Sequence, residues 1–161
     1  MPLLNYSDNR PMEAHPDFKE LLELFNNLNV EYLIVGAYAL AFYGAPRNTG
    51  DIDLFVNPTP ENAEKIISAL HAFGFGSLGL SPVEFTKPGQ VIQLGVAPVR
   101  IDLLTSLSGV GWTEAESGKV DGTYGDVPVF YIGKREYVTN KRATGRTKDK
   151  ADIEAIGESA D

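Results

Sequence analysis

The spacing of apolar positions changes along the chain, and each change marks a different secondary-structure element. Over 16–29 the apolar residues recur every three or four positions, which predicts an amphipathic helix. A short apolar run at 32–35 predicts a strand, and 37–43 predicts a shorter helix after a glycine. At 51–56 two carboxylates alternate with apolar residues, which predicts a strand with one buried face.

The second half of the chain continues with helical stripes and short β patterns. Thr59 and Pro60 are favourable at the N-cap and first position of a helix that Gly74 would end. The other predicted elements are strands near 83–86 and 91–95 joined by a turn at 87–89, a strand at 99–104, a mobile surface loop at 106–118, strands near 119–123 and 127–131, and two helices from 134 to about 156 with a hinge near Gly145. This order predicts a mixed α/β sheet with hairpins, flanked by helices.

Length and composition indicate a single soluble domain. Residues 1–15 are polar and without a period, so we expect a loose arm before one domain over 16–161. Hydrophobic content is 43% and charged content 22%, as in soluble globular proteins. The chain has no cysteine, no membrane-length apolar run and no signal-peptide pattern, so we expect a cytoplasmic protein with no membrane contact. A net charge of -8 disfavours large nucleic acids as partners.

Asp51 and Asp53 are the first candidates for chemistry. Alternation places both on one face of the predicted strand, roughly 7 Å apart at Cα. Two neighbouring carboxylates repel each other unless a positive group lies between them, and Mg²⁺ prefers such hard oxygen ligands. The structural alternative is a solvated strand face, but aspartate is disfavoured in strands. We therefore favour a metal site.

Asp102 provides a third carboxylate on the predicted strand 99–104. If this strand pairs beside 51–56, its carboxylate faces the first two, and three carboxylates can hold two metal ions about 4 Å apart for phosphoryl transfer. The alternative is a salt bridge between Asp102 and Arg100, which alternation places on the same face. The sequence alone leaves both interpretations open.

The segment before Asp51 contains candidate contacts for a phosphate group. Gly36 opens the short helix, where free N–H groups attract phosphate and the missing side chain permits close approach; the alternative is a simple tight turn. Ala37 follows it. Arg47 and Thr49 lie on the loop before the carboxylates, and Arg47 either pairs with Asp51 or steers a triphosphate.

The one dense basic cluster of this acidic chain lies near the C-terminus. Its members are Lys141, Arg142, Arg146, Lys148 and Lys150. A solvated helix surface is the structural alternative, but a triphosphate beside three carboxylates needs further positive charge. Lys141 is our first candidate for this role and Lys148 the second. We expect Asp149 and Asp152 to tether the last helix to this cluster. We find no Ser–His–Asp arrangement and no histidine cluster typical of a metal site.

Together these motifs resemble the signature of the DNA polymerase beta-type nucleotidyltransferase superfamily. The matching residues are Val35-Gly36-Ala37, Asp51-Ile-Asp53 and Asp102. The runs at 47–54 and 141–154 are similar to smaller prokaryotic members, including AbiEii-type toxins. The resemblance extends from residue 16 to about 157.

The resemblance implies a mixed sheet flanked by helices, two Mg²⁺ ions, and transfer of a nucleoside monophosphate with release of pyrophosphate. Asp51, Asp53 and Asp102 would bind the metal, Asp102 is also a candidate base, and Gly36 would contact the triphosphate. Ala37 departs from the usual glycine or serine, which removes a hydroxyl but keeps the backbone N–H. The large C-terminal domain of many relatives has no counterpart, so the acceptor would bind in an open cleft, near 106–118, or against a partner chain.

Our first hypothesis is a metal-dependent nucleotidyltransferase that uses a nucleoside triphosphate. Its acceptor would be a small molecule, a protein or a tRNA end, and metal and Lys141 would stabilise the charge that develops during attack on the α-phosphorus. The alternative is a catalytically weak, antitoxin-like binding module that works with a partner protein or as a homodimer. A glycosyltransferase that uses Asp-x-Asp with a nucleotide sugar is a third hypothesis.

Overall fold

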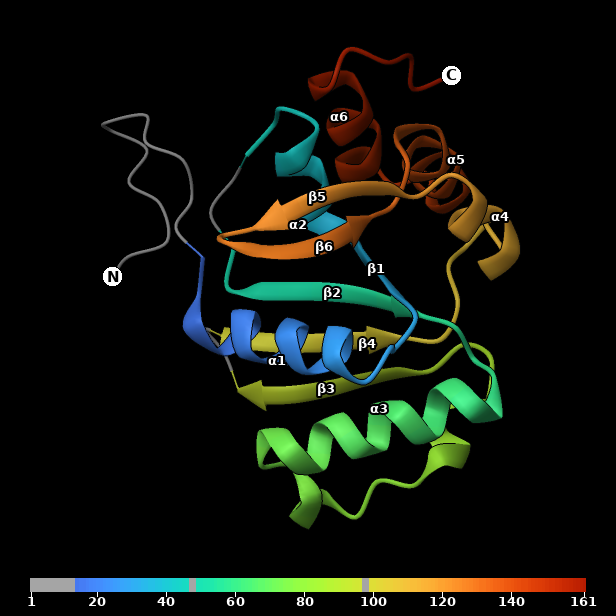
Figure 1. The fold of residues 1–161 in the computed structure, drawn as a ribbon. Helices are drawn as coiled ribbons and strands as arrows, with labels where there is room; N and C mark the ends of the chain where they lie inside the picture. Colours follow the sequence, from blue (N-terminus) through green and yellow to red (C-terminus); the bar gives the residue numbers. More distant parts are fainter. Residues whose placement is uncertain (1–13, 47–48, 97–98) are drawn as a thin grey trace.

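The architecture is a mixed six-stranded sheet with helices on both faces (Figure 1). The computed structural model describes residues 14–46, 49–96 and 99–161. Across the described sheet the strand order is β3-β4-β2-β1-β6-β5, in which β1 pairs in parallel with β6 and β2 with β4. The strands are β1 Tyr32–Val35, β2 Asp51–Val56, β3 Val91–Val96, β4 Val99–Leu104, β5 Val120–Tyr124 and β6 Val127–Tyr131.

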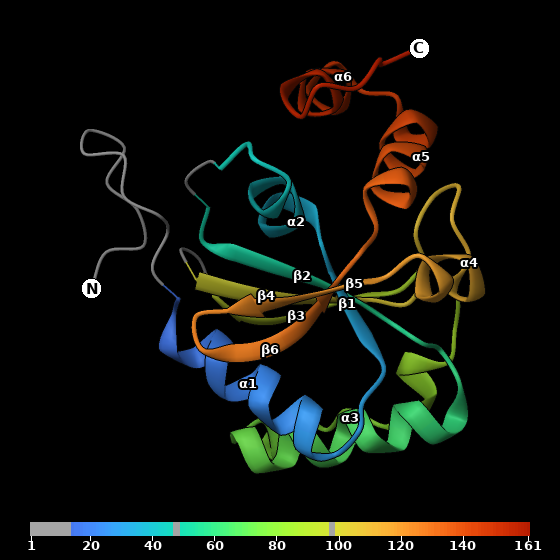
Figure 2. The ribbon, with the colours of Figure 1, turned by 45° about the horizontal axis from the view of Figure 1, so that its top comes forward.

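The helices form a layer on each side of this sheet. They are α1 Pro16–Asn27, α2 Gly36–Phe42, α3 Pro60–Phe73, α4 Trp112–Ser117, α5 Lys134–Thr144 and α6 Thr147–Ala155. Figure 2 shows α1 and α3 on one side of the sheet, α2, α5 and α6 on the other, and α4 beside one end of the sheet. The predicted α/β fold with a mixed sheet flanked by helices is thus confirmed.

The core follows the alternation that the sequence predicts in β2. Ile52 and Leu54 are buried, whereas Asp51 and Asp53 are only partly buried. The end of the strand is buried on both faces, because Phe55 also packs edge-on against Trp112 of α4, with ring centroids 5.1 Å apart. The strand is therefore anchored at its apolar end and presents its carboxylates at the other.

Two predicted segments differ from the structure. Residues 83–86 are not a strand, because a 3₁₀ helix spans Pro82–Phe85. The Glu84 carboxylate accepts hydrogen bonds from the Ser81 N–H at 2.6 Å and from its hydroxyl at 3.1 Å, and this local capping favours a helical turn over an extended chain. The predicted loop 106–118 contains α4, whose Ala115 is buried.

Most other boundaries agree with the prediction. α2 begins one residue early, at Gly36, and Gly145 separates α5 from α6 in a left-handed conformation with φ 63°. Of the predicted arm, residues 1–13 lie outside the described residues. None of the helices in the described part of the chain is both long and apolar enough to cross a membrane.

We expect Thr59→Ala to lower the free energy of unfolding by about 1 kcal/mol. The Thr59 hydroxyl accepts a hydrogen bond from the Asn62 N–H at the start of α3, and alanine leaves that donor without this partner. Urea denaturation measures the change. Thr59→Ser keeps the hydroxyl and should stay close to wild type; an equal loss in both variants would contradict the capping role.

Candidate active site

Two neighbouring inner strands, β2 and β4, bring the acidic residues together on the sheet, and β1 leads into Gly36 beside them. In the parallel pair β2–β4, Asp53 lies opposite Asp102, and Asp51 lies opposite Arg100. In the antiparallel pair β1–β2, Asp53 lies opposite Val35, the last residue before Gly36. Paired residues in neighbouring strands share a face. The strand of Asp102 therefore does pair beside that of Asp51 and Asp53, as the metal-site hypothesis requires.

Arg100 connects two of these carboxylates. Its Nε atom donates to Asp102 Oδ1 at 2.8 Å and its Nη2 atom to Asp102 Oδ2 at 3.1 Å. The same Nη2 lies 3.0 Å from Asp51 Oδ2. The salt bridge that the sequence left open as an alternative is therefore present. It occupies both oxygens of Asp102.

Asp53 is a carboxylate whose pKa lies well above its ordinary value. Burial, then the charge of Asp102 and a hydrogen bond with it, and then the charge of Asp51 together raise the pKa of Asp53 to about 6, against a lowering by Lys141. Such a shift means that the ionised form lacks sufficient positive charge around it. The group is thus a place where added cationic charge would be stabilising.

Position 36 requires glycine for two reasons: its backbone conformation and the lack of space for a side chain. Its φ of 66° is in the left-handed region, which side chains with a Cβ rarely adopt. A Cβ atom at this position would also overlap Oδ2 of Asp53. The chain consequently passes from β1 into α2 with its backbone directly against the Asp53 carboxylate.

A polar cleft of about 340 Å³ lies between the start of β2 and the C-terminal helices. Its lining residues are Gly36, Ala37, Thr49, Asp51, Asp53, Lys141, Arg146 and Lys148. The structure therefore brings together most of the predicted site residues. Asp102 lies beside Arg100 and does not line the cleft, and Arg47 lies outside the described residues. The Thr49 hydroxyl accepts a hydrogen bond from the Asp51 N–H at 3.2 Å and so shapes the start of β2.

Arg146 lines the cleft although sequence reasoning did not select it as a site residue. It is the N-cap residue of α6 and one of several basic residues in the cluster. Its position three residues before Asp149 was the available signal, because this spacing places the two side chains together at a helix start. Another member of the cluster, Arg142, instead donates to the Ser159 carbonyl at 2.5 Å.

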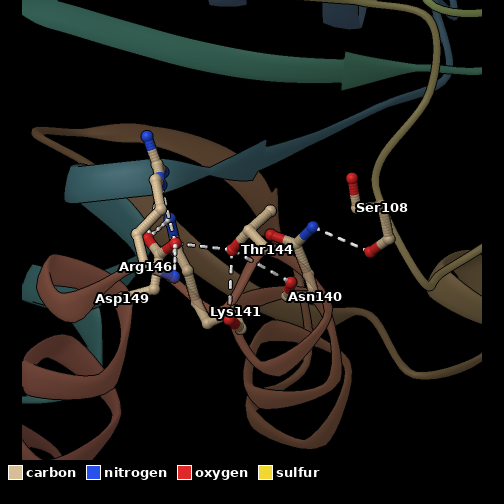
Figure 3. Close-up of polar contacts among 6 residues, drawn as sticks. All are labelled: Ser108, Asn140, Lys141, Thr144, Arg146 and Asp149. Atoms are coloured by element: carbon tan, nitrogen blue, oxygen red, sulfur yellow. Dashed lines mark hydrogen bonds and ion pairs between the residues drawn. The ribbon is translucent and has the colours of Figure 1, made fainter.

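Asp149 holds the turn between α5 and α6 (Figure 3). Its fully buried carboxylate accepts hydrogen bonds from Arg146 Nε at 2.7 Å and Nη2 at 3.0 Å, and from the Thr144 hydroxyl at 2.6 Å. The Arg146 side chain is the main reason that the pKa of Asp149 lies well below its usual range. The expected tether of the last helix to the basic cluster is thus confirmed for Asp149.

Lys141 is held in the same arrangement. Its Nζ atom lies 3.7 Å from Asp149 Oδ1, and only 13% of its side chain is exposed. Burial lowers its pKa, whereas the charges of Asp149 and Asp152 raise it. On the other side of α5, the Asn140 amide donates to the Ser108 carbonyl at 2.9 Å and attaches the helix to the loop before α4 (Figure 3).

The described side chains do not form a ready-made metal-binding site. Among residues 14–46, 49–96 and 99–161, no three His, Cys, Asp or Glu side chains are arranged to hold an ion together. The donor chemistry nevertheless fits a hard divalent cation, because Asp51, Asp53 and Asp102 are carboxylates on two paired strands. The Arg100 guanidinium already supplies a positive charge between two of them.

A larger hollow of about 450 Å³ lies away from the carboxylates. It is lined by side chains around the start of β1, β6 and α4, among them Tyr32, Phe130 and Trp112. Asp51, Asp53 and Asp102 are not among the residues that line it. The chemistry is therefore concentrated in the smaller, polar cleft.

Comparison with known proteins identifies the family. Residues 17–124 match the family described as aminoglycoside-2''-adenylyltransferase. The matched residues make up more than half of the chain. The chain belongs to the aminoglycoside-2''-adenylyltransferase family. It is accordingly a nucleotidyltransferase, which moves a nucleoside monophosphate from a nucleoside triphosphate to an acceptor. This membership confirms the resemblance at the level of the superfamily. The similarity to AbiEii-type members stays a prediction.

Solved structures share the fold of this family member at low sequence identity. The antibiotic-resistance factor ANT(2'')-Ia is 13% identical, with a TM-score of 0.58 over 87% of this chain and 80% of that chain. The lincosamide antibiotic adenylyltransferase LnuA, solved with lincomycin bound, is also 13% identical, with a TM-score of 0.54 over 89% and 96%. An antigenic nucleotidyltransferase-like protein from Paracoccidioides brasiliensis is 18% identical, with a TM-score of 0.53 over 89% and 75%. Comparison with curated proteins gives no match.

We expect Asp53→Asn to stabilise the metal-free protein at neutral pH. Because the folded pKa of about 6 exceeds the unfolded value near 3.8, the folded state retains this proton longer, and its free energy of unfolding falls as pH rises from 4 to 6. The variant should therefore be about 1–3 kcal/mol more stable than wild type at pH 8 and equal to it below pH 4. Urea denaturation with a chelator present measures both. Equal stability at pH 8 would contradict the crowding of charge at Asp53.

We expect Asp149→Asn to lower the free energy of unfolding by about 3 kcal/mol, because the largely buried Lys141 loses its counter-charge and Arg146 loses the buried carboxylate that it binds with two nitrogens. Since the folded pKa of Asp149 is depressed, its contribution should be complete above pH 4 and lost as the pH falls further. Glu154→Gln, on the exposed side of α6, is the matched control and should change stability by less than about 0.5 kcal/mol. Similar losses in the two variants would reject the role of the tether.

Proposed function

We propose that this protein is a Mg²⁺-dependent adenylyltransferase that modifies a hydroxyl group of a small, cationic molecule of the antibiotic type. The observation that carries the proposal is the cleft in which acidic strand ends face basic helix ends. The family match supports adenylyl transfer, and the antibiotic-modifying proteins among its structural neighbours support the acceptor class.

The charge distribution of the cleft is suited to a triphosphate. On one side Lys141, Arg146 and Lys148 provide positive charge, and on the other Asp51 and Asp53 provide oxygen ligands for Mg²⁺. Bound Mg²⁺ would neutralise phosphate charge and withdraw electrons from the reacting phosphorus. The Gly36 and Ala37 backbone lines the same cleft, so a phosphate group can approach the chain closely.

In the proposed reaction the acceptor oxygen forms a bond to the α-phosphorus of the nucleotide. The bond from that phosphorus to the bridging oxygen breaks, and pyrophosphate leaves. Lys141 is held in the cleft wall, where its charge would stabilise the negative charge that develops on the phosphate oxygens. Asp102 is our candidate for accepting the proton of the acceptor hydroxyl, a role that requires Arg100 first to release the Asp102 oxygens.

The overall charge of the chain supports a cationic acceptor. A net charge of -8 attracts positively charged small molecules and repels large nucleic acids. A protein or tRNA acceptor is therefore less favoured than a small polyamine-like or amino-sugar-like molecule. The antitoxin-like binding module is the competing hypothesis, and it predicts neither nucleotide transfer nor heat on addition of metal.

The test is transfer of label from α-labelled ATP to aminoglycosides and lincosamides in the presence of Mg²⁺. We expect wild type to label at least one of these acceptors, a chelator to abolish the reaction, and Asp53→Asn to reduce the rate by about 10²–10³-fold, as for other losses of an electrostatic group at a reacting centre.

Asp121→Asn is the matched control, because Asp121 is an exposed carboxylate on β5 that does not line the cleft. Its rate should equal that of wild type. Equal labelling by wild type and Asp53→Asn would reject the catalytic assignment. Absence of labelling with every acceptor and every nucleoside triphosphate would favour the binding module.

A further inference from the structure

Arg100 lies at the position where a cation shared by Asp51 and Asp102 would be expected. We propose that its guanidinium is a built-in counter-ion of the metal-free protein, which a divalent cation must displace before it can bind. This inference rests on the proposed function in one respect, since it takes Asp51 as a metal ligand, and it adds Asp102, the third ligand that the sequence predicts. It goes further by assigning to Arg100 a role that excludes metal while its ion pairs are formed.

Arg100 contacts both oxygens of Asp102 and one oxygen of Asp51. Two of its nitrogens reach the two oxygens of Asp102 at 2.8 and 3.1 Å, in the forked arrangement typical of strong arginine–carboxylate pairs. The second nitrogen also lies 3.0 Å from Asp51 Oδ2. One planar group therefore neutralises charge on both strands.

The Arg100 Nη2 atom lies where a metal ion would bridge Asp51 Oδ2 and Asp102 Oδ2. Mg²⁺ binds carboxylate oxygens at about 2.0–2.1 Å and needs nearly ideal octahedral geometry. An ion bound to both Asp51 and Asp102 would be within a few ångströms of the Arg100 Nη2 atom, where two positive charges repel strongly. Metal binding therefore requires at least the bridging nitrogen to leave.

The surroundings of Arg100 allow its side chain to move while its backbone stays in place. Its N–H donates to the Gly50 carbonyl at 2.9 Å, which fixes the start of β4 beside β2. Its partner across the antiparallel β3–β4 pair is Gly95, which offers no side chain on that flank. The Arg100 side chain is 28% exposed, so part of it already borders the solvent into which it would rotate.

This exchange gives the metal-free protein a physical advantage. Without a positive group, removing metal would leave Asp51, Asp53 and Asp102 with uncompensated repulsion, and a partly buried unpaired charge is costly. Arg100 keeps two of these carboxylates paired when metal is absent. The cost of breaking those pairs lowers the apparent affinity for metal, so the site would fill only when the divalent cation is abundant.

The direct test follows the Nε–H group of Arg100 by NMR in ¹⁵N-labelled protein titrated with MgCl₂. Arg100→Lys lacks this group and assigns its signal. We expect saturating Mg²⁺ to shift the signal and accelerate its exchange with water, because the hydrogen bond to Asp102 is lost. An unchanged Arg100 signal, while the carboxylate ¹³C signals of the site respond to Mg²⁺, would overturn the proposal and leave the metal site intact.

A second measurement compares the affinity for Mg²⁺ and Mn²⁺ by calorimetry in the absence of nucleotide. We expect Arg100→Gln to bind at least tenfold more tightly than wild type. The matched control Arg135→Gln removes an equally charged but exposed residue at the start of α5 and should leave the Kd unchanged. Unchanged or weaker binding by Arg100→Gln would overturn the proposal.

Arg100→Lys separates the geometry of the fork from its charge. Lysine keeps one positive charge but cannot bind Asp102 with two nitrogens while also reaching Asp51. We expect its affinity to lie between those of wild type and Arg100→Gln, and this variant carries the test if Arg100→Gln does not fold. Absence of heat and of NMR response in every protein would reject the metal site itself, and with it both this inference and the proposed function.

Discussion

The repulsion among Asp51, Asp53 and Asp102 is the constraint on which the candidate site depends. Pairing of β2 with β4 places Asp53 directly opposite Asp102 on one face of the sheet. The raised pKa of Asp53, about 6, is the electrostatic consequence of burial and of these neighbours. An arrangement of this kind persists only if the rest of the fold supplies positive charge and rigid support.

That support comes from two directions. From within the sheet, Arg100 bridges Asp51 and Asp102. From outside it, the turn between α5 and α6 presents basic side chains to the cleft, and Asp149 holds this turn through Arg146 and Thr144 (Figure 3). A chain that is acidic overall thus builds a local basic wall, because the buried carboxylate of Asp149 organises the few cations near the C-terminus.

The same arrangement supports our proposal that this member of the aminoglycoside-2''-adenylyltransferase family combines two kinds of binding. In that proposal strand residues would provide hard oxygen ligands, while helix residues would provide point charges for phosphate groups. The glycine between β1 and α2 lets the backbone lie against Asp53, where any Cβ atom would overlap the carboxylate. Differences among family members in acceptor choice are then expected in the walls of the cleft, since the carboxylates are held by the sheet itself.

The sequence by itself determined the local features: the alternation in β2, the strand β4, the cap at Thr59, the break at Gly145 and the three acidic residues. Each follows from spacing within a few residues. It missed the 3₁₀ turn at Pro82–Phe85 and the helix α4, where a local capping pair and contact with the core outweighed a weak pattern. Only the tertiary structure decided that β4 pairs beside β2, that Arg100 spans two carboxylates and that Arg146 reaches the cleft. These contacts depend on the order of strands and the packing of helices, which join residues far apart in the chain and leave no periodic signal along it.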